Sequence, residues 1–385
     1  MKEVRIGVIG FGNMGSNHAK SLYEGNVKNG KLVAVCDINE EKLKKSKELY
    51  SDIVCYDNHH DMLKDSNIDA VIVATPHYDH PSIAIDALKA NKHVVIEKPA
   101  GVYTKAVREM NEVGNNTDRV FAIMYNQRTD PYYSKVKELI DAGELGEIRR
   151  VNWIITDWYR PQSYYNSGGW RATWAGEGGG VLLNQDPHQL DIWQWICGMP
   201  TRIRAFCHFG KMHDIEVEDD VTAYAEYANG ATGVFVTSTS DAPGTNRLEI
   251  SGDQGKIVVE DGKITFWRLR VSEREFNATF TGGFGNPECW KCEINVKPNP
   301  LQQHVAILTN FVDAILNGKE LIAPAVEGIR GLTISNAMHL SAWTDDWVNL
   351  PIDEDLYYSK LQEKIKNSTI VKETKSVTLD VDGTF

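Results

Sequence analysis

The sequence predicts two folded parts: a doubly wound α/β domain with a parallel sheet, then an α+β domain with a large, mainly antiparallel sheet. In the first 125 residues, short β-rich runs alternate with helical segments, the order that builds a parallel sheet covered on both faces. Beyond residue 128, strand-like stretches follow one another with glycine and Asn-Gly breaks, which favour hairpins. We therefore divide the chain into residues 1–125, 126–345 and a polar C-terminal extension at 346–385.

The elements of the first part are predicted from their patterns. The run VRIGVIG at 4–10 is continuously apolar, as expected of a buried strand, and a helix follows at 13–24. Further strands are expected at 31–37, 53–56, 69–75, 93–96 and 120–125. Further helices are expected at 40–49, 81–91 and 104–113.

The second part begins with a helix at 131–142 that ends at Gly143. Strands are expected at 147–157, 201–209, 220–227, 231–238, 246–251, 256–260 and 263–270. Asn229-Gly230 and Asp261-Gly262 are typical of hairpin turns. Two helical patterns follow at 301–317 and 326–343, and residues 346–385 read as an irregular tail.

Composition excludes several classes of protein. The 385 residues carry a net charge of −12, which repels phosphate backbones, so we expect no nucleic-acid partner. No apolar run approaches the roughly 20 residues of a membrane helix, and no secretory signal is visible, so we expect a cytoplasmic protein that does not enter membranes. Cys289 and Cys292 form one CxxC without the second pair of a zinc knuckle. We expect reduced thiols and no metal.

A glycine motif, GxGxxG, occupies residues 10–15. It directly follows a predicted strand and opens a helix, the context typical of a dinucleotide-binding Rossmann turn. Its glycines permit a tight turn, close approach of a pyrophosphate, and packing of helix on strand. The candidate cofactor-binding residues here are Gly10, Phe11, Gly12, Asn13, Met14 and Gly15.

Asp37 ends the second predicted strand, 22 residues after Gly15. A carboxylate at this position accepts hydrogen bonds from the ribose hydroxyls of NAD and repels the 2′-phosphate of NADP, so we expect NAD as the cofactor. Thr75 and Pro76 end the fourth strand at the edge where ligands bind. They either line the cofactor site or simply stop the strand.

Two further motifs complete the pattern: Glu97-Lys98-Pro99 closes the fifth strand, and GGGVLLNQDPHQLD occupies residues 178–191. With the glycine turn and Asp37, they resemble the Gfo/Idh/MocA family of sugar and cyclitol oxidoreductases over roughly residues 1–343. The resemblance implies that Lys98 and His188 are catalytic and lie beside the nicotinamide, with Glu97 and Lys98 at the cofactor. Histidine suits the base that takes a hydroxyl proton, and a lysine ammonium stabilises the developing alkoxide.

The chain departs from the common family pattern at two positions. Asn184 stands where many members have aspartate; we expect it to share a helix face with His188, where it either hydrogen-bonds a substrate hydroxyl or holds the imidazole. Asp186 stands where glycine is frequent, and it either binds substrate or accompanies the turn at Pro187. Asp191 is either a substrate contact or a packing residue.

Substrate contacts are also expected in an aromatic segment. Six of the ten tryptophans lie within 153–195, which suits stacking on sugar rings, although at least half of them are expected to be core or interface residues. Trp170 and Arg171 resemble the family's substrate loop. Asn126 and Arg128 follow the sixth strand as candidate hydrogen-bond donors, while Arg128 could instead lock the two domains together.

These observations predict an NAD-dependent oxidoreductase acting on a secondary alcohol of a sugar, glycoside or cyclitol, for example a glucoside 3-dehydrogenase or an inositol dehydrogenase. An alternative is a glycoside-cleaving enzyme that works by transient oxidation and elimination. A third is a non-catalytic NAD-binding regulator, against which intact Lys98 and His188 argue. The resemblance also implies a homodimer or homotetramer built on the open sheet face.

Overall fold

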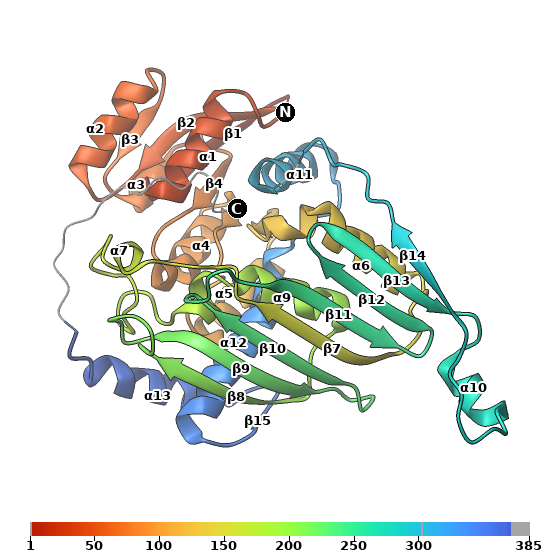
Figure 1. The fold of residues 1–385 in the computed structure, drawn as a ribbon. Coiled ribbons are helices and arrows are strands. Elements are labelled where there is room, and N and C mark those ends of the chain that lie inside the picture. Colours follow the sequence, from red (N-terminus) through yellow and green to blue (C-terminus); the bar gives the residue numbers. More distant parts are fainter. Residues whose placement is uncertain (1, 302, 371–385) are drawn as a thin grey trace.

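The computed structural model describes residues 2–301 and 303–370 and contains two sheets (Figure 1). The first sheet has six parallel strands in the order β3-β2-β1-β4-β5-β6, which confirms the predicted doubly wound α/β part. Its strands are Val4–Ile9 (β1), Gly30–Cys36 (β2), Val54–Tyr56 (β3), Ala70–Val73 (β4), His93–Ile96 (β5) and Phe121–Ile123 (β6). All of β4 and nearly all of β1 are buried, which explains their continuous apolar runs.

Helices connect the parallel strands. They are Asn13–Tyr23 (α1), Glu40–Leu49 (α2), His59–Lys64 (α3), the 3₁₀ turn His77–Asp79 (η1), His80–Lys89 (α4) and Thr104–Asn115 (α5). The short helix α3 was not predicted from the hydrophobic pattern. It begins where the Asn58 side chain accepts a hydrogen bond from the backbone N–H of His60, an N-cap signal.

The second sheet has nine strands in the order β14-β13-β12-β11-β7-β10-β9-β8-β15. Only the β7–β10 pair among the described strands of this sheet is parallel, so the expectation of a mainly antiparallel sheet is confirmed. Asp261 and Gly262 both have positive φ, as a tight hairpin turn requires. The strands are Ile148–Ile155 (β7), Arg202–Phe209 (β8), Glu218–Glu226 (β9), Thr232–Ser238 (β10), Asn246–Gly252 (β11), Gly255–Glu260 (β12), Lys263–Leu269 (β13), Cys289–Ile294 (β14) and Val348–Asn349 (β15).

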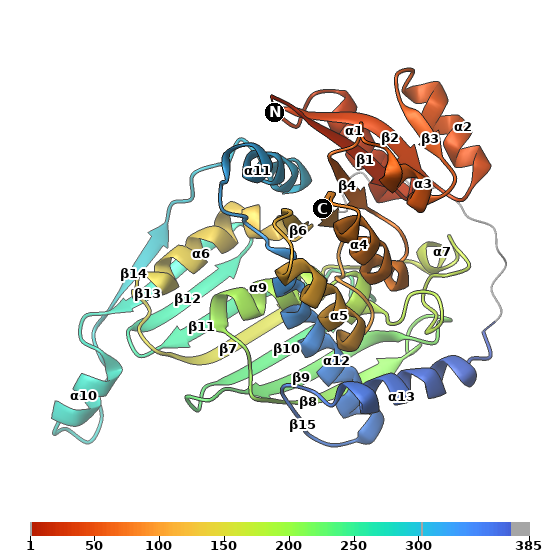
Figure 2. The same cartoon turned by 180° about the vertical axis from the view of Figure 1, so that it is seen from behind.

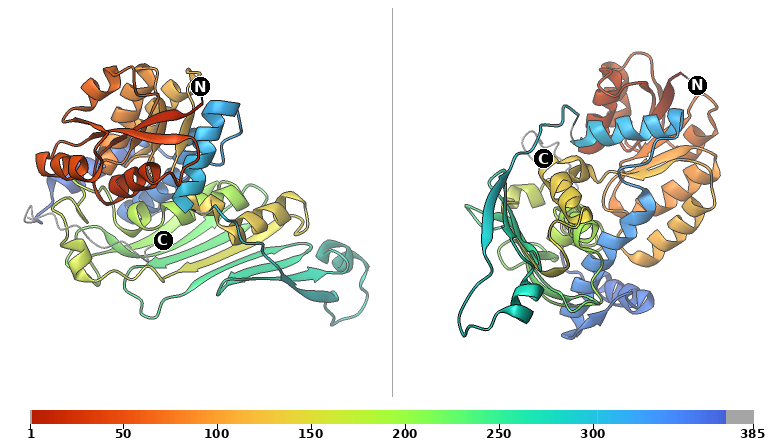
Figure 3. Two further views of the ribbon diagram at one scale, coloured as in Figure 1. Left: turned by 90° about the horizontal axis from the view of Figure 1, so that it is seen from above. Right: turned by 90° about the vertical axis from the view of Figure 1, so that its right-hand side faces the viewer.

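Helices α6, α9 and α12 cover one face of this sheet, and among the described residues no helix covers the other face (Figures 2 and 3). The remaining elements are Asn126–Thr129 (η2), Pro131–Asp141 (α6), Gln162–Tyr165 (α7), Val181–Asn184 (α8), Pro187–Cys197 (α9), Glu273–Thr279 (α10), Gln303–Asn317 (α11), Ala325–Glu327 (η3), Gly328–Thr344 (α12) and Glu354–Lys366 (α13).

The expectation of an irregular tail from residue 346 is wrong for its first part, because β15 and α13 lie there. Asp353 caps α13, and Tyr357 and Leu361 are buried, so packing orders a segment whose sequence is largely polar. Strand β14 and helix α10 were not predicted either. Residues 371–385 of the expected extension lie outside the described residues.

Residues 303–324, which follow β14 in the sequence, pack against the first sheet and form a seam between the two parts of the chain. Helix α11 packs against β1 and β2. The N–H of Ile123 donates to the carbonyl of Ala323 at 3.0 Å, and Ala122 forms a bridge with Pro324. Residues 303–324 therefore pack on the face and on the outer edge of the first sheet.

Two findings bear on the expected setting of the protein. Within the described ranges, no helix is long and apolar enough to span a bilayer. All six cysteines are unpaired, and Cys289 and Cys292 both lie on β14.

Candidate active site

The glycine turn after β1 has the geometry that its sequence predicted. Gly10 has φ +92°, and a Cβ there would lie 2.5 Å from the Ala74 carbonyl oxygen. A Cβ on Gly15 would lie 1.8 Å from the Gly10 carbonyl oxygen. Any residue other than glycine at position 15 would therefore prevent helix α1 from packing against the turn. Gly12, in contrast, faces open space, with no atom within 4 Å of a built Cβ. The turn needs glycine at two positions for its own packing and leaves the third open toward a ligand.

Asp37 lies against this turn at the end of β2. Its Oδ2 accepts a hydrogen bond from the Phe11 N–H at 2.7 Å, and its Oδ1 accepts one from the Asn39 N–H at 2.9 Å. Lys42 Nζ lies 3.5 Å from the same Oδ2. These two backbone N–H groups therefore hold the Asp37 carboxylate in place beside the glycine turn.

The surroundings of the turn fit an NAD dinucleotide. Gly12 is the N-cap residue of α1 and has no side chain to cap the helix, so the first N–H groups of α1 can meet a diphosphate. Asn13 and Met14 are partly exposed in that first turn. Thr75 is partly exposed just after β4, its Oγ1 has no hydrogen-bond partner among the described residues, and the exposed Pro76 directly follows it.

Glu97 is buried at the end of β5 and is held by the protein itself. Its Oε1 lies 2.6 Å from His18 Nε2, and its Oε2 accepts from the Lys98 N–H at 3.1 Å. Burial alone would raise the pKa of Glu97, but the hydrogen bond and charge of His18 bring that pKa down to about 2. Its carboxylate stays ionised and orients the lysine that follows it.

Lys98 reaches across to the second part of the chain. Its Nζ donates to the backbone carbonyl of Asn184 at 2.7 Å, and the Lys98-Pro99 bond is cis. Burial lowers the pKa of the Lys98 ammonium, which Glu97 partly opposes.

His188 is buried in the first turn of α9, with its ring against the edge of Tyr125 at 6.4 Å between centroids. Its Nδ1 has no hydrogen-bond partner among the described residues. Burial and the positive charge of Lys98 lower the pKa of His188 well below its usual range. The imidazole is therefore neutral at neutral pH, the state in which it can accept a proton.

Asn184 and His188 do not lie on one helix, so that expectation is wrong. Helix α8 ends at Asn184 and α9 begins at Pro187, and the two residues between them form a turn. The Asn184 amide instead donates to the Tyr164 hydroxyl at 3.2 Å and to the Glu177 carboxylate.

Tyr164 is the centre of a hydrogen-bond network around Asn184. Its hydroxyl also accepts from Arg171 at 2.9 Å and from the Gln185 amide at 3.3 Å. Arg171 lies 3.6 Å from the buried Glu177 carboxylate. Its guanidinium stacks over Tyr164 and Trp170, 4.6 Å from each ring centre. The partly exposed Trp170 also meets the buried His77 edge to face.

Asp186 is fully buried behind the start of α9 and presents no surface to a substrate in this conformation. Burial raises the pKa of Asp186 well above its usual range, and neither the Thr237 hydroxyl nor the charge of Lys98 offsets this. Of the two roles considered for Asp186, this geometry favours the one tied to the turn at Pro187.

Arg128 and Asn126 make contacts within the protein. Arg128 binds both carboxylate oxygens of Asp191 at 2.7 Å and also pairs with Glu327 at 2.6 Å. The buried Asn126 donates to Gln303 at the start of α11. All of these partners lie in the same part of the chain as Arg128, so Arg128 ties η2 to α9 and η3 and does not join the two domains through these contacts, while Asp191 has the packing role.

Half of the six tryptophans of the aromatic segment are buried in the core. Trp153, Trp174 and Trp193 are buried in the core, whereas Trp158, Trp170 and Trp195 are partly exposed.

Sequence reasoning missed Glu177, Gln185 and His304, and it did not single out Tyr164. His304 lies with its ring centre 5.5 Å from that of His18, and burial lowers its pKa to about 4. No local motif marks His304, which follows Glu97 by about 200 residues. Glu177 could have been found, because it stands directly before the glycines of the 178–191 motif.

Comparisons with known proteins agree with this arrangement. Residues 4–125 match the family described as oxidoreductases with an NAD-binding Rossmann fold, and residues 133–258 match the GFO/IDH/MocA C-terminal domain. The chain is 28% identical to the myo-inositol 2-dehydrogenase of Thermotoga maritima over 268 residues, which cover 68% of this chain and 77% of that protein.

Two other proteins are similar over nearly their whole length. The scyllo-inositol 2-dehydrogenase (NAD(+)) of Bacillus subtilis is 24% identical over 345 residues, covering 87% of this chain and 93% of that protein. The crystal structure of the WlbA dehydrogenase of Chromobacterium violaceum, in complex with NADH and UDP-GlcNAcA, superposes with a TM-score of 0.78. That match has 25% sequence identity and covers 92% of this chain and 97% of the other.

Proposed function

Because this chain belongs to the GFO/IDH/MocA family of NAD-binding oxidoreductases, we propose that it is an NAD-dependent dehydrogenase. It transfers hydride between the nicotinamide and a secondary alcohol of a sugar, glycoside or cyclitol. One observation carries this proposal. Lys98, which follows β5 of the first sheet, donates a hydrogen bond to the Asn184 carbonyl, four residues before His188. Burial lowers the pKa of His188 and so keeps its imidazole neutral.

The residues that would hold NAD lie on the first sheet. The turn at Gly12 and the N-terminus of α1 would receive the diphosphate, and Asp37 the hydroxyls of the adenosine ribose. Thr75 would offer a hydroxyl that no described residue bonds, and Glu97 would keep Lys98 oriented. When bound, NAD supplies the hydride acceptor.

The side chains of the protein would then have two tasks: to remove the hydroxyl proton of the substrate and to stabilise the charge on its oxygen. His188, neutral at neutral pH, would take the hydroxyl proton as the carbinol is oxidised. The Lys98 ammonium would hold the same oxygen and stabilise its developing negative charge. In the opposite direction, the same two groups would polarise a ketone and return the proton.

The network around Tyr164 is the proposed substrate-binding region. It offers the guanidinium of Arg171, the amide of Asn184 and the indole of Trp170, a set that suits hydroxyl groups and the C–H face of a ring. Two of the relatives above are inositol dehydrogenases, and levoglucosan dehydrogenase shares the fold. A polyhydroxylated ring is therefore the proposed substrate.

We further propose a homodimer or homotetramer that forms through the uncovered face of the nine-stranded sheet. Strands β7, β8 and β9 expose Ile154, Phe206 and Tyr224, respectively. The unpaired cysteines agree with a cytoplasmic setting, where thiols stay reduced.

A substrate panel assayed with NAD and with NADP tests the proposal. The panel contains myo-inositol, scyllo-inositol, levoglucosan, glucose, an aryl glucoside and a uronic acid. We expect NADH formation with at least one polyol, and far less activity with NADP. Release of the aglycone without net NADH would favour the glycoside-cleaving alternative, and NAD binding without turnover of any compound would favour the regulator.

A further inference from the structure

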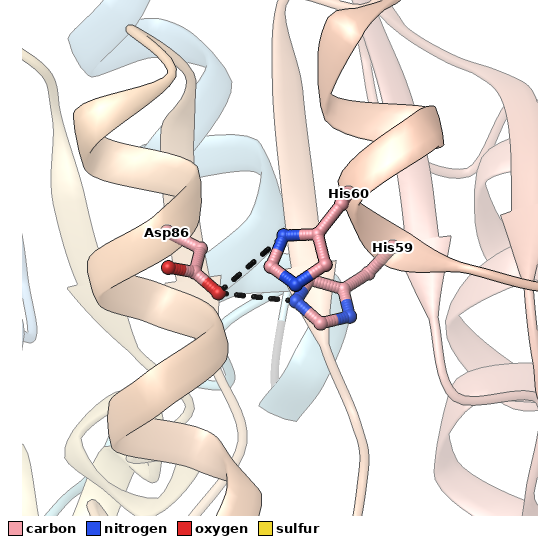
Figure 4. A group of neighbouring side chains, drawn as sticks. All are labelled: His59, His60 and Asp86. Atoms are coloured by element: carbon pink, nitrogen blue, oxygen red, sulfur yellow. Dashed lines mark hydrogen bonds and ion pairs between the residues drawn. The ribbon is translucent and has the colours of Figure 1, made fainter.

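A cluster of metal-ligating side chains lies on the nucleotide-binding part of the chain. Figure 4 shows His59 and His60, the first residues of α3, beside Asp86 of the neighbouring helix α4. His59 Nε2 lies 3.1 Å, and His60 Nδ1 3.7 Å, from the same carboxylate oxygen, Oδ2 of Asp86. One ligand atom from each of the three residues lies within 4.8 Å of the others.

The local structure explains how adjacent histidines reach one point. Successive residues of a helix point in different directions, so two neighbours do not normally converge. Here His59 uses its distant ring nitrogen and His60 its near one, and the two ring centres are 4.0 Å apart. The Asn58 cap fixes the start of α3 and with it this pair.

Hydrogen bonding alone is a weak reason for this arrangement. The side chains of His59, His60 and Asp86 are 24%, 58% and 37% exposed, and surface pairs of this kind contribute only about 0–1 kcal/mol. Ordering three side chains also costs conformational entropy. A ligand shared by all three would account for their convergence.

We propose that His59, His60 and Asp86 bind a divalent transition-metal ion of the zinc type. Imidazole nitrogen and carboxylate oxygen are ligands that Zn²⁺ prefers, whereas Ca²⁺ and Mg²⁺ prefer oxygen alone. Tetrahedral bonds of about 2.0–2.2 Å separate ligand atoms by roughly 3.3 Å. The distances of 3.1 and 3.7 Å lie on either side of that value.

The ion would reinforce the contact between two helices that the His59–Asp86 hydrogen bond already joins. Helix α3 follows β3, the edge strand, and α4 follows β4 near the centre of the sheet. An ion at this site clamps the outer part of the nucleotide-binding half to its middle. Three protein ligands leave one tetrahedral position to water, so the ion remains exchangeable. This inference does not depend on the proposed dehydrogenase activity.

The test is calorimetric titration of Zn²⁺ into the full chain, without an affinity tag and stripped with a chelator. The variants are His59→Ala, His60→Ala and Asp86→Asn. The matched control is His208→Ala, because His208 is also exposed and pairs with a carboxylate, that of Asp220 at 3.0 Å. We expect the chain and the control to bind one equivalent, and each cluster variant to bind on the order of tenfold more weakly or worse.

Co²⁺ gives a second readout, because its visible absorption reports nitrogen and oxygen ligation directly. The band should appear with the unchanged chain and His208→Ala and be lost in the cluster variants. The circular dichroism of each variant confirms that it is folded. Equal Zn²⁺ affinity in all variants, or no binding by the unchanged chain, would overturn the proposal.

Discussion

The glycine turn and the contact between Lys98 and the chain before His188 both gather polar groups, but over very different lengths of chain. The turn meets Asp37 across 26 residues of sequence, through a hydrogen bond from Phe11. Lys98 meets the Asn184 carbonyl across 86 residues, and Arg128 meets Glu327 across 199. The nucleotide side is thus built from neighbouring elements at the glycine turn, whereas on the substrate side the contact between Lys98 and Asn184 forms only in the assembled fold.

This difference predicts how the two sides respond to change. A variant on the nucleotide side should alter cofactor binding and leave the rest of the site intact. A variant on the substrate side should alter turnover or stability without changing affinity for NAD. The following experiments test that separation.

The largest expected effect comes from removing the two proposed catalytic groups. Lys98→Ala and His188→Ala should each lower kcat by about 10²–10⁴-fold, the contribution typical of a positioned acid or base. The NAD dissociation constant, measured by fluorescence titration, should stay within a few-fold of the original. Lys89→Ala and His208→Ala, at exposed positions, serve as controls. Unchanged turnover in either test variant would remove that residue from the mechanism.

Arg128→Met should destabilise the fold by about 3–5 kcal/mol, because it leaves Asp191 buried without its partner. Urea unfolding followed by tryptophan fluorescence measures the change. Arg119→Met is the matched control, since Arg119 pairs with the exposed Asp118 and should change stability by about 0.5 kcal/mol or less. If the two variants unfold alike, the buried ion pair between Arg128 and Asp191 does not stabilise the fold.

Asp37→Ser should weaken NAD binding by about 10–100-fold. This is the change in affinity expected from losing a hydrogen bond to a charged group, which contributes roughly 1.5–3 kcal/mol. NADP binding should not weaken, because the repelling carboxylate is gone and Lys42 stands beside the site. Affinities for both cofactors give the ratio. Asp52→Ser, at an exposed position, is the control. An unaltered ratio would contradict the role of Asp37 in cofactor choice.

Tyr164→Phe should raise the substrate KM by about fivefold, the effect of losing roughly 1 kcal/mol of hydrogen bonding, with NAD affinity unchanged. Steady-state kinetics on the best substrate of the panel provide the measurement. Tyr159→Phe is the comparison, since Tyr159 is 50% exposed. A change in NAD affinity instead of KM would show that the two sides are not separate.

The smallest effect is on the pH profile. Since burial and Lys98 lower the pKa of His188 well below its ordinary value of 6.5, the neutral base persists as pH falls through 6.5. The kcat/KM for alcohol oxidation should therefore not fall until the pH is well below 6.5. A decline centred at 6.5 that is absent in His188→Ala would show that His188 titrates like an exposed histidine.

The nucleotide side could be predicted from sequence because its requirements are local. Gly10 needs positive φ, Gly15 allows no side chain, and Asp37 ends the next strand, all within one strand–helix–strand unit. The same holds for Lys98, which closes a strand.

The substrate side could not be read in this way. The pattern of residues 178–191 predicted one helix, but the chain turns between Asn184 and Pro187. His304 enters the site through tertiary packing alone, and α13 is ordered by burial of Tyr357 rather than by a strong hydrophobic pattern. Propensity is a weak guide where distant contacts decide.

The seam at Ala323 and Pro324 limits how this chain can be divided or recombined. Strand β6 is an edge strand, and unpaired edges are templates for aggregation. Here a late segment pairs with that edge while α11 packs on β1 and β2. A fragment ending at residue 125 would expose both surfaces and should aggregate. A chimera that borrows its nucleotide half from a relative must therefore bring the matching 303–324 segment with it.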